Sequence, residues 1–219
     1  MMGHAILGWD GGDAEAPARR ARARPRHLEV IARWAASGRL SLAVPLLDPV
    51  GSGALGSLMI LGGEDELGAR EYLQDEPFAR EGVWLSYQMR PFRIAPLPYA
   101  PLPSGPVSDT PTHAVLIAED RPGAAPRRAA AREAHLARML PLAGDGTLAC
   151  GGALLDAAGA MVGSIAVTRH ASVAEARRFW AEDPYVTGGV WGQMDFYATR
   201  FAPLPYAPLP GAAPPGATP

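Results

Sequence analysis

The nine residues Ala-Pro-Leu-Pro-Tyr-Ala-Pro-Leu-Pro occur twice in this chain of 219 residues, at 95–103 and again, unchanged, at 202–210. Shifting the chain by the same 107 positions also places Gly82-Val83-Trp84 on Gly189-Val190-Trp191. These matching residues lie outside the proline-rich tract and keep their order along the chain. Because an internal repeat determines the architecture more than any other sequence feature, we interpret the chain as two tandem copies of one domain.

Equivalent positions continue towards the N-terminal end of each copy, with an offset that grows as small insertions accumulate. The further matches are Gly56-Ser57 with Gly163-Ser164 at an offset of 107, Arg24 with Arg132 and His27 with His135 at 108, and His4–Leu7 with His113–Leu116 at 109. A coincidence of composition would not carry histidine, arginine and glycine positions in one order. The repeat therefore extends over nearly the whole chain.

The composition is typical of a globular protein with no polyanionic partner. Hydrophobic residues make up 48% of the chain and the formal net charge is -2, so we expect no nucleic acid partner. The N-terminal residues lack the pattern of a secretory signal, and no apolar run is long enough for a membrane span. The single cysteine, Cys150, cannot form a disulfide within the chain. We therefore expect a cytoplasmic protein.

Apolar periodicity predicts the same order of elements in both copies. The expected elements are strand 5–9, helix 22–37, strands 40–47 and 57–61, helix 66–74 and strand 83–94, then strand 114–118, helix 127–140, strands 148–155 and 161–168, helix 172–182 and strand 189–201. The order βαββαβ is the ferredoxin-like motif. The sequence therefore predicts an α+β fold with two tandem ferredoxin-like domains.

The helices of such a domain cover one face of its sheet and leave the other face bare. Two copies in one chain can cover each other sheet to sheet, as an intramolecular dimeric α/β-barrel. We expect domains at 1–94 and 112–201, a proline-rich arm and linker at 95–111, and a second arm and tail at 202–219. Further association into a homo-oligomer is left open.

Several short motifs resemble those of the YCII-related family of small dimeric α/β-barrel proteins. In order, the motifs are Arg24–Leu28, Gly56-Ser57 and Asp75–Trp84 ("DEPF…EGVW") in the first copy, and Arg132–Leu136, Gly163-Ser164 and Asp183–Trp191 in the second. The resemblance covers nearly all of both copies except the proline tracts and the tail. It implies a ferredoxin-like fold, two units packed sheet to sheet, and a His and Asp pair in a pocket beside the sheet. A few family members resemble ring-acting lyases or dehalogenating enzymes.

Two histidines are the candidate catalytic bases. His27 and His135 each lie three positions after an arginine, Arg24 or Arg132, and share a helix face with it. A carboxylate bonded to one ring nitrogen would fix the tautomer of the histidine, and the arginine can hold an anionic group of a substrate. Histidines at a helix edge that bond only water fit the same spacing, and this alternative stays open.

The candidate carboxylates precede a proline. Asp183 stands there in the second copy and Glu76 in the first, where Asp75 lies one position earlier, so which of the two faces His27 is left open. Proline pushes its predecessor out of helical geometry. Glu76 and Asp183 should therefore end the second helix, where a negative charge opposes the helix dipole at a cost of up to about 1 kcal/mol. Broken local rules favour a functional role, although a solvated turn carboxylate also fits.

Ser57 and Ser164 follow a glycine at a strand start and are candidate ligand donors. No histidine has metal-site spacing with cysteine or acidic neighbours, and the glycine-rich segment 51–56 lacks the lysine of a phosphate loop, so we expect no metal and no cofactor. The preferred hypothesis is a small-molecule enzyme that uses the His/acid pairs for elimination, isomerisation or a related lyase reaction on an anionic or aromatic ligand. The alternative is a non-catalytic ligand-binding or regulatory barrel.

The proline tracts allow two interpretations. Their prolines have the PxxP spacing of polyproline II ligands, but flanking basic residues are few, and a semi-rigid arm is the simpler interpretation. Because both arms follow the last strand of their copy, we predict that each arm packs against the other copy.

Overall fold

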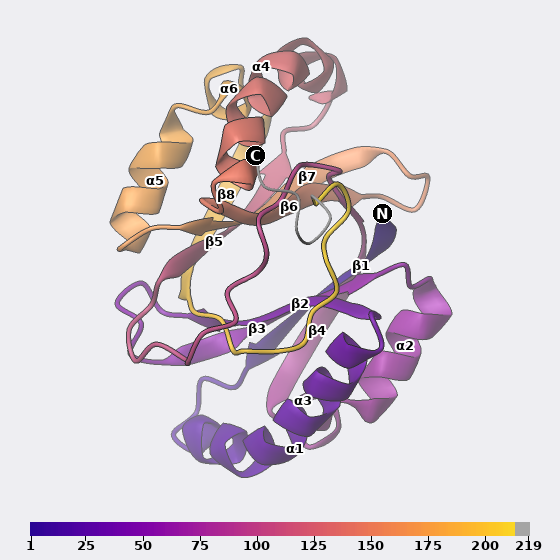
Figure 1. The fold of residues 1–219 in the computed structure, drawn as a ribbon, viewed down its shortest axis with the longest axis vertical. Coiled ribbons are helices and arrows are strands. Elements are labelled where there is room, and N and C mark those ends of the chain that lie inside the picture. The colour runs from indigo at the N-terminus through magenta and orange to yellow at the C-terminus, as the bar shows by residue number, and fades with distance from the viewer. Residues whose placement is uncertain (213–219) are drawn as a thin grey trace.

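Eight antiparallel strands form one closed barrel in the computed structural model, which describes residues 1–212 (Figure 1). The strands are β1 (Met2–Asp10), β2 (Leu40–Leu47), β3 (Ala54–Gly62), β4 (Trp84–Ile94), β5 (His113–Asp120), β6 (Leu148–Leu155), β7 (Met161–Arg169) and β8 (Trp191–Thr199). Their order around the barrel is β1-β3-β2-β8-β5-β7-β6-β4. The barrel therefore consists of two four-stranded sheets, one from each copy. The end of the predicted tail, 213–219, lies outside the described residues.

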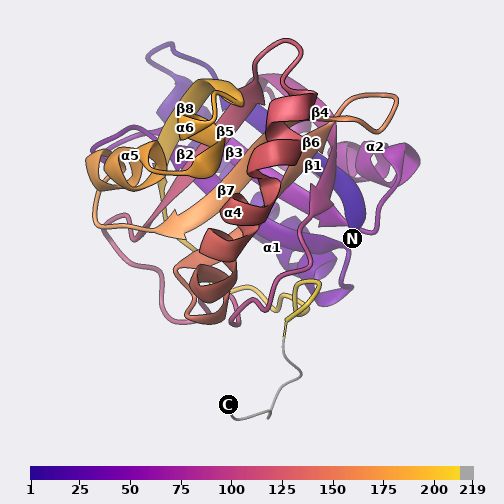
Figure 2. The same ribbon diagram turned by 90° about the horizontal axis from the view of Figure 1, so that it is seen from above.

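The helices lie outside the barrel, on opposite sides for the two halves (Figures 1 and 2). They are α1 (Ala16–Ala36), α2 (Glu66–Asp75), α3 (Pro77–Arg80), α4 (Ala125–Gly144), α5 (Val173–Ala181) and α6 (Pro184–Thr187). This is the α+β, intramolecular dimeric α/β-barrel that the repeat predicts. The sequence did not reveal the short helices α3 and α6, which follow α2 and α5 directly.

The longest helices begin earlier than predicted. α1 starts at Ala16 with Pro17 in its first turn, where the missing N–H of proline removes no helical hydrogen bond. The proline therefore belongs to the helix, although its neighbourhood resembles a loop. The first helix does end just before Gly38, as predicted, and this glycine has a positive φ of 76°. Gly146 has the same φ just after α4.

Strand side chains alternate between the barrel interior and the helices. Ala5 and Leu7 of β1 belong to the cluster that also contains Phe92, whereas Ile6 between them packs with Trp34 of α1 in the other cluster. This alternation is the period of two expected for a strand buried on both faces. Each half thus has its own helix–sheet core, and the barrel interior joins the halves.

Two junctions close the barrel between the halves. β4 pairs with β6 through Phe92–Leu154, Arg93–Ala153 and Ile94–Gly152, whereas β2 pairs with β8 only through Leu47–Ala198. The halves are equivalent in topology but joined unequally.

The register of the first strands corrects one detail of the sequence alignment. Gly8 is opposite Ser57, and Ala118 is opposite the equivalent Ser164, so β1 and β5 correspond at an offset of 110 rather than 109. His4 and His113 are therefore not equivalent. A slip of one residue exchanges the two faces of a strand, and the shared His-Ala dipeptide hid this slip.

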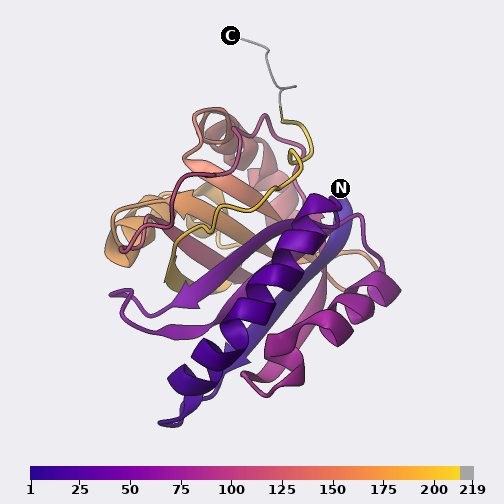
Figure 3. The same cartoon turned by 60° about the horizontal axis from the view of Figure 1, so that its bottom comes forward.

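The proline arms lie against the opposite halves, as the repeat predicted (Figure 3). The hydroxyl of Tyr99 accepts from the N–H of Gly151 on β6 (3.1 Å) and donates to its carbonyl oxygen (2.9 Å). The hydroxyl of Tyr206 makes the same two bonds with Ala43 on β2 (3.0 and 3.1 Å). Each tyrosine thus satisfies one backbone residue of a strand in the other half.

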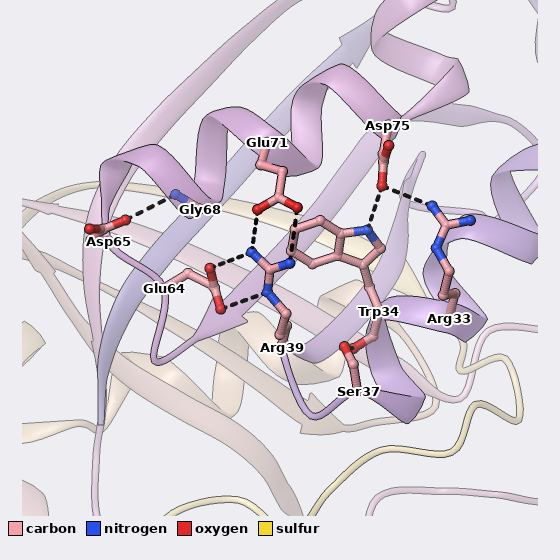
Figure 4. Close-up of polar contacts among 9 residues, drawn as sticks. All are labelled: Arg33, Trp34, Ser37, Arg39, Glu64, Asp65, Gly68, Glu71 and Asp75. Atoms are coloured by element: carbon pink, nitrogen blue, oxygen red, sulfur yellow. Dashed lines mark hydrogen bonds and ion pairs between the residues drawn. The ribbon is translucent and has the colours of Figure 1, made fainter.

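The first half also has a charged network without counterpart in the described residues of the second (Figure 4). Arg39 pairs with Glu64 and Glu71, at 2.8 and 2.7 Å, and stacks over the ring of Trp34. The indole N–H of Trp34 donates to Asp75 (3.0 Å). These contacts fix the end of α1 against α2.

No helix within residues 1–212 combines the length and apolar character that crossing a membrane requires.

Candidate active site

The structure brings His27 of α1 to the carboxylate of Glu76. Nδ1 of His27 lies 2.8 Å from Oε1 of Glu76, so the ring donates this hydrogen to the carboxylate. Glu76 is fully buried and also accepts from the hydroxyl of Tyr72 (2.6 Å) and the N–H of Phe78 (2.9 Å). Three donors therefore hold the carboxylate in place.

The second half repeats this arrangement with a shorter acid. Nδ1 of His135 lies 2.9 and 3.1 Å from the two carboxylate oxygens of the fully buried Asp183. The N–H of Tyr185 donates to Asp183 (2.9 Å), and the imidazole stacks on the Tyr185 ring with centroids 3.9 Å apart. His27 stacks on Phe78 at the same separation. Both rings are fixed by a hydrogen bond at one edge and an aromatic face.

The position of these carboxylates corrects the expected conflict with a helix dipole. Glu76 does end α2, but it is also the N-cap of α3, and Asp183 is the N-cap of α6. A carboxylate is favourable at a helix N-terminus, where it accepts from free N–H groups. The acidic residue before proline is therefore explained in part by capping.

The remaining candidate acid, Asp75, does not face His27. Its carboxylate accepts from Trp34 and from Arg33 of α1, at 3.0 and 2.8 Å (Figure 4). These bonds lower the pKa of Asp75, with the indole of Trp34 as the main cause. Of the two adjacent acids in the first half, only Glu76 contacts the histidine.

An arginine and an aspartate beside each pair were not found from the sequence. Arg20 contacts Asp10 at 2.7 Å and donates to the hydroxyl oxygen of Ser57 (3.0 Å). Burial is the main cause that raises the pKa of Asp10, against the lowering effect of Arg20. The sequence does contain a signal for these arginines, because Arg20 matches Arg128 at the same offset of 108 that relates His27 to His135.

The second half contains the equivalent triplet. Arg128 forms two bonds with Asp120, both 2.7 Å long, and donates to the hydroxyl oxygen of Ser164 (3.0 Å). Its guanidinium lies over the Tyr185 ring, 4.5 Å from the centroid. Ser164, like Ser57, accepts from an arginine and keeps its own hydroxyl hydrogen, so its role as a ligand donor stays a prediction.

Each histidine lines a cavity between a helix and the sheet. The cavities share an arginine, a histidine, a serine and an aromatic ring: Arg24, His27, Ser57 and Phe78 in the first half, and Arg132, His135, Ser164 and Tyr185 in the second. Their volumes differ, at about 140 Å³ in the first half and about 410 Å³ in the second. Small-molecule pockets have volumes of roughly 300–1,000 Å³, and the second-half cavity falls within this range.

At two equivalent positions the side chain is smaller in the second-half cavity than in the first-half cavity. Met59 lines the first-half cavity, and Ala166 stands at its equivalent position in the second half. Ala43 likewise corresponds to Gly151. The smaller side chains leave space beside His135 that Met59 fills beside His27.

Other reactive groups are few within residues 1–212. Burial raises the pKa of the Cys150 thiol to about 12, so the thiol stays protonated near neutral pH. The described residues contain no group of three or more His, Cys, Asp or Glu side chains placed to hold a metal ion. The indole N–H of Trp191, in the wall of the second-half cavity, is buried and has no acceptor among these residues, and Trp84 repeats this in the first half.

Fold and site together define an intramolecular dimeric α/β-barrel with a histidine–carboxylate pair in each half. The family model for the YCII-related domain matches the chain twice, at residues 2–93 and 112–197. The chain therefore belongs to the YCII-related domain family, as a tandem duplication within one polypeptide. It matches no curated protein at a significant level.

Solved structures support the fold. A heme-binding protein from Thermus thermophilus is 14% identical over 91% of this chain and 92% of its own, with a TM-score of 0.54. A mutant chlorite dismutase from Candidatus Nitrospira defluvii is 13% identical over 91% of each chain, with a TM-score of 0.54. At such identities the likeness concerns the fold alone.

One shorter match is more similar in sequence. The 5-chloro-2-hydroxyhydroquinone dehydrochlorinase of Burkholderia phenoliruptrix AC1100, solved with 2,5-dihydroxybenzoquinone, is 27% identical, covering 38% of this chain and 89% of its own, with a TM-score of 0.36.

Proposed function

We propose that the protein is a small-molecule enzyme in which His135, oriented by Asp183, moves a proton to and from a ligand held in the second-half cavity. The observation that carries this proposal is the hydrogen bond between Nδ1 of His135 and Asp183, in the wall of a cavity of about 410 Å³. A histidine held in this way keeps one tautomer, with its other nitrogen, Nε2, free to accept a proton.

The surroundings of His135 suit this role. Nε2 forms no hydrogen bond within the described residues, while the carboxylate of Asp183 is bonded to the other ring nitrogen and stabilises the imidazolium that forms after proton uptake. Stacking on Tyr185 restricts rotation of the ring. Proton removal from carbon or oxygen, followed by elimination or isomerisation, is the chemistry that such a base supports.

The first half carries the same pair, His27 and Glu76, beside a cavity of about 140 Å³. Its chemistry is equivalent, but its space is below that of ordinary ligand pockets. We therefore assign turnover to the second half, with His27 as the matched control in the same chain.

The test is exchange of carbon-bound hydrogen in D₂O, followed by NMR with a panel of small enolisable or aromatic acids. His135→Gln should abolish any exchange that the wild type catalyses, and Asp183→Asn should slow it roughly 10- to 1,000-fold because the tautomer is no longer fixed. His27→Gln should retain most of the rate. If the double variant without both histidines exchanged as fast as the wild type, the proposal would be abandoned.

A non-catalytic ligand-binding barrel is the second candidate, because the buried thiol leaves no strong nucleophile besides the histidines among the described residues. It predicts that small acids raise the melting temperature without any exchange or turnover. Melting curves and the NMR assay on the same samples separate the two functions.

A further inference from the structure

The second-half cavity receives a charged side chain from the first half. Arg93 lies on β4 between Phe92 and Ile94, which belong to the buried barrel cluster. Successive side chains of a strand point to opposite faces, so Arg93 points out of the barrel. There it lines the cavity of the other half together with Arg132 of α4.

These two guanidinium groups are not neutralised by the protein. Within residues 1–212, neither Arg93 nor Arg132 forms a side-chain hydrogen bond or ion pair, and both are exposed at the opening of the cavity. The third arginine of the cavity, Arg128, is instead held by both oxygens of Asp120. Two positive charges therefore remain available to a ligand.

The equivalent position in the first half is occupied by the linker. Arg200 corresponds to Arg93 at an offset of 107, and its guanidinium donates to the carbonyl oxygens of Ser108 (3.1 Å) and Asp109 (2.8 Å). Val107 from the same linker also lines the first-half cavity. Among the described residues, this linker contact occurs in the first half alone.

We propose that Arg93 and Arg132, one from each half, together bind the anionic group of a small aromatic or apolar acid in the second-half cavity. Guanidinium groups bind carboxylate and phosphate oxygens through paired, charge-assisted hydrogen bonds. The remaining wall suits an apolar body, since it contains Leu136, Met139, Leu148, Ile165, Trp180 and Trp191. The inference rests on the proposed function, because it names the ligand class of the same cavity.

Calorimetric titration of the full chain tests this site with benzoate and phenyl phosphate as probes and neutral benzamide as the uncharged control. We expect one site per chain for an anion and weaker binding of benzamide. Arg93→Gln should weaken anion binding about tenfold, as expected for loss of a charge-assisted hydrogen bond, and should leave benzamide unaffected. The stronger of the two anions identifies carboxylate or phosphate as the preferred group.

Arg200→Gln is the matched control, because it removes the same charge from the equivalent strand position. It should leave anion binding within about twofold of the wild type, because Arg200 is held by the linker. A second pair of variants tests whether anion binding needs the larger volume of the second-half cavity. Ala166→Met, which fills that cavity, should abolish anion binding, whereas Met59→Ala in the first half should not weaken it. Equal losses in Arg93→Gln and Arg200→Gln, unchanged binding in Arg93→Gln, two sites per chain, or no binding of either anion at millimolar concentration would each overturn the proposal.

The same variants separate this site from the proposed chemistry. His135→Gln should abolish proton exchange and Arg93→Gln should weaken anion binding, so exchange and binding are both measured on each variant. Anion binding that depends on Arg93 without any proton exchange would leave the anion site standing and remove the catalytic role. Proton exchange that needs His135 but not Arg93 would leave the catalytic role standing and remove the anion site.

Discussion

At the scale of single residues, the two histidine sites differ in how their acids are held. Glu76 accepts from His27, Tyr72 and Phe78. Burial, and after it the adjacent charge of Glu76, raises the pKa of the Tyr72 phenol well above its ordinary value. Asp183 instead gives both oxygens to His135. Asp183 also accepts from the N–H of Tyr185 but from no hydroxyl group among the described residues. It therefore shares its charge with one donor fewer than Glu76 does, which favours the second half as the site of proton transfer.

A third histidine makes the stability of the fold depend on pH. His113 is buried at the start of β5, and burial, with smaller effects of Arg169 and His170, lowers its pKa to about 4. The unfolded chain protonates this ring near pH 6.5. The contribution of this group to stability is therefore complete above about pH 6.5 and is lost as the pH falls towards 4, because the unfolded state binds the proton first.

We expect the wild type to lose about 2 kcal/mol of unfolding free energy between roughly pH 7 and pH 4.5 through this group. His113→Asn removes the titrating ring, so its stability should change less over the same interval. Urea unfolding followed by circular dichroism at both pH values measures the difference. The same pH slope in both proteins would contradict the assignment to His113.

The pairing of each histidine with an acid was implied by the family resemblance, and the shared helix face of arginine and histidine by spacing, whereas the arginine–aspartate neighbours were not predicted. Arg24 and His27 lie three residues apart on a helix, and this interval fixes a common face in any protein. Arg20 of α1 contacts Asp10 at the end of β1, next to a register shift between Trp9 and Asp10. Helix spacing is thus readable in a sequence, while contacts across elements depend on strand register.

At the scale of elements, the proline arms act as clips on strands of the opposite half. Tyr99 is 2% exposed, and its hydroxyl satisfies both backbone groups of Gly151. Burial raises the pKa of the equivalent Tyr206 well above its ordinary range, so the phenol stays protonated and can donate. The two identical nonamers thus make equivalent tyrosine contacts with the opposite halves.

Removing one hydroxyl should weaken this clip without disturbing its packing. Tyr206→Phe leaves the N–H and carbonyl of Ala43 without their side-chain partner, at an expected cost of about 1–3 kcal/mol. Thermal or urea unfolding measures this loss, and Tyr87→Phe on an exposed stretch of β4 is the matched control with little expected change. Equal stability of Tyr206→Phe and the wild type would show that the arm needs no hydroxyl.

At the scale of the whole molecule, duplication covers the sheet face that the helices of a single copy leave bare. In each half the helices cover the outer face, and the inner face, with Leu7 and Phe92 in the first half, is covered only by the other half. The repeat predicted this pairing, because a lone ferredoxin-like unit would leave those side chains in water. The unequal junctions and the linker contacts of Arg200 were not predictable, since they arise from the single connection between the copies.

The first half expressed alone, as residues 1–111, should therefore not exist as a folded monomer. Its bare inner face and the equivalent strand edges of β2 and β4 favour a symmetric homodimer that rebuilds the barrel. Light scattering coupled to size exclusion should give twice the mass of the fragment, with an unfolding midpoint that rises with protein concentration. The fragment 112–219 serves as the second test, and mixing the two should give a complex with one copy of each. A monomer with cooperative unfolding independent of concentration would show that the two halves are autonomous, and the shared interior would then contribute little to the fold.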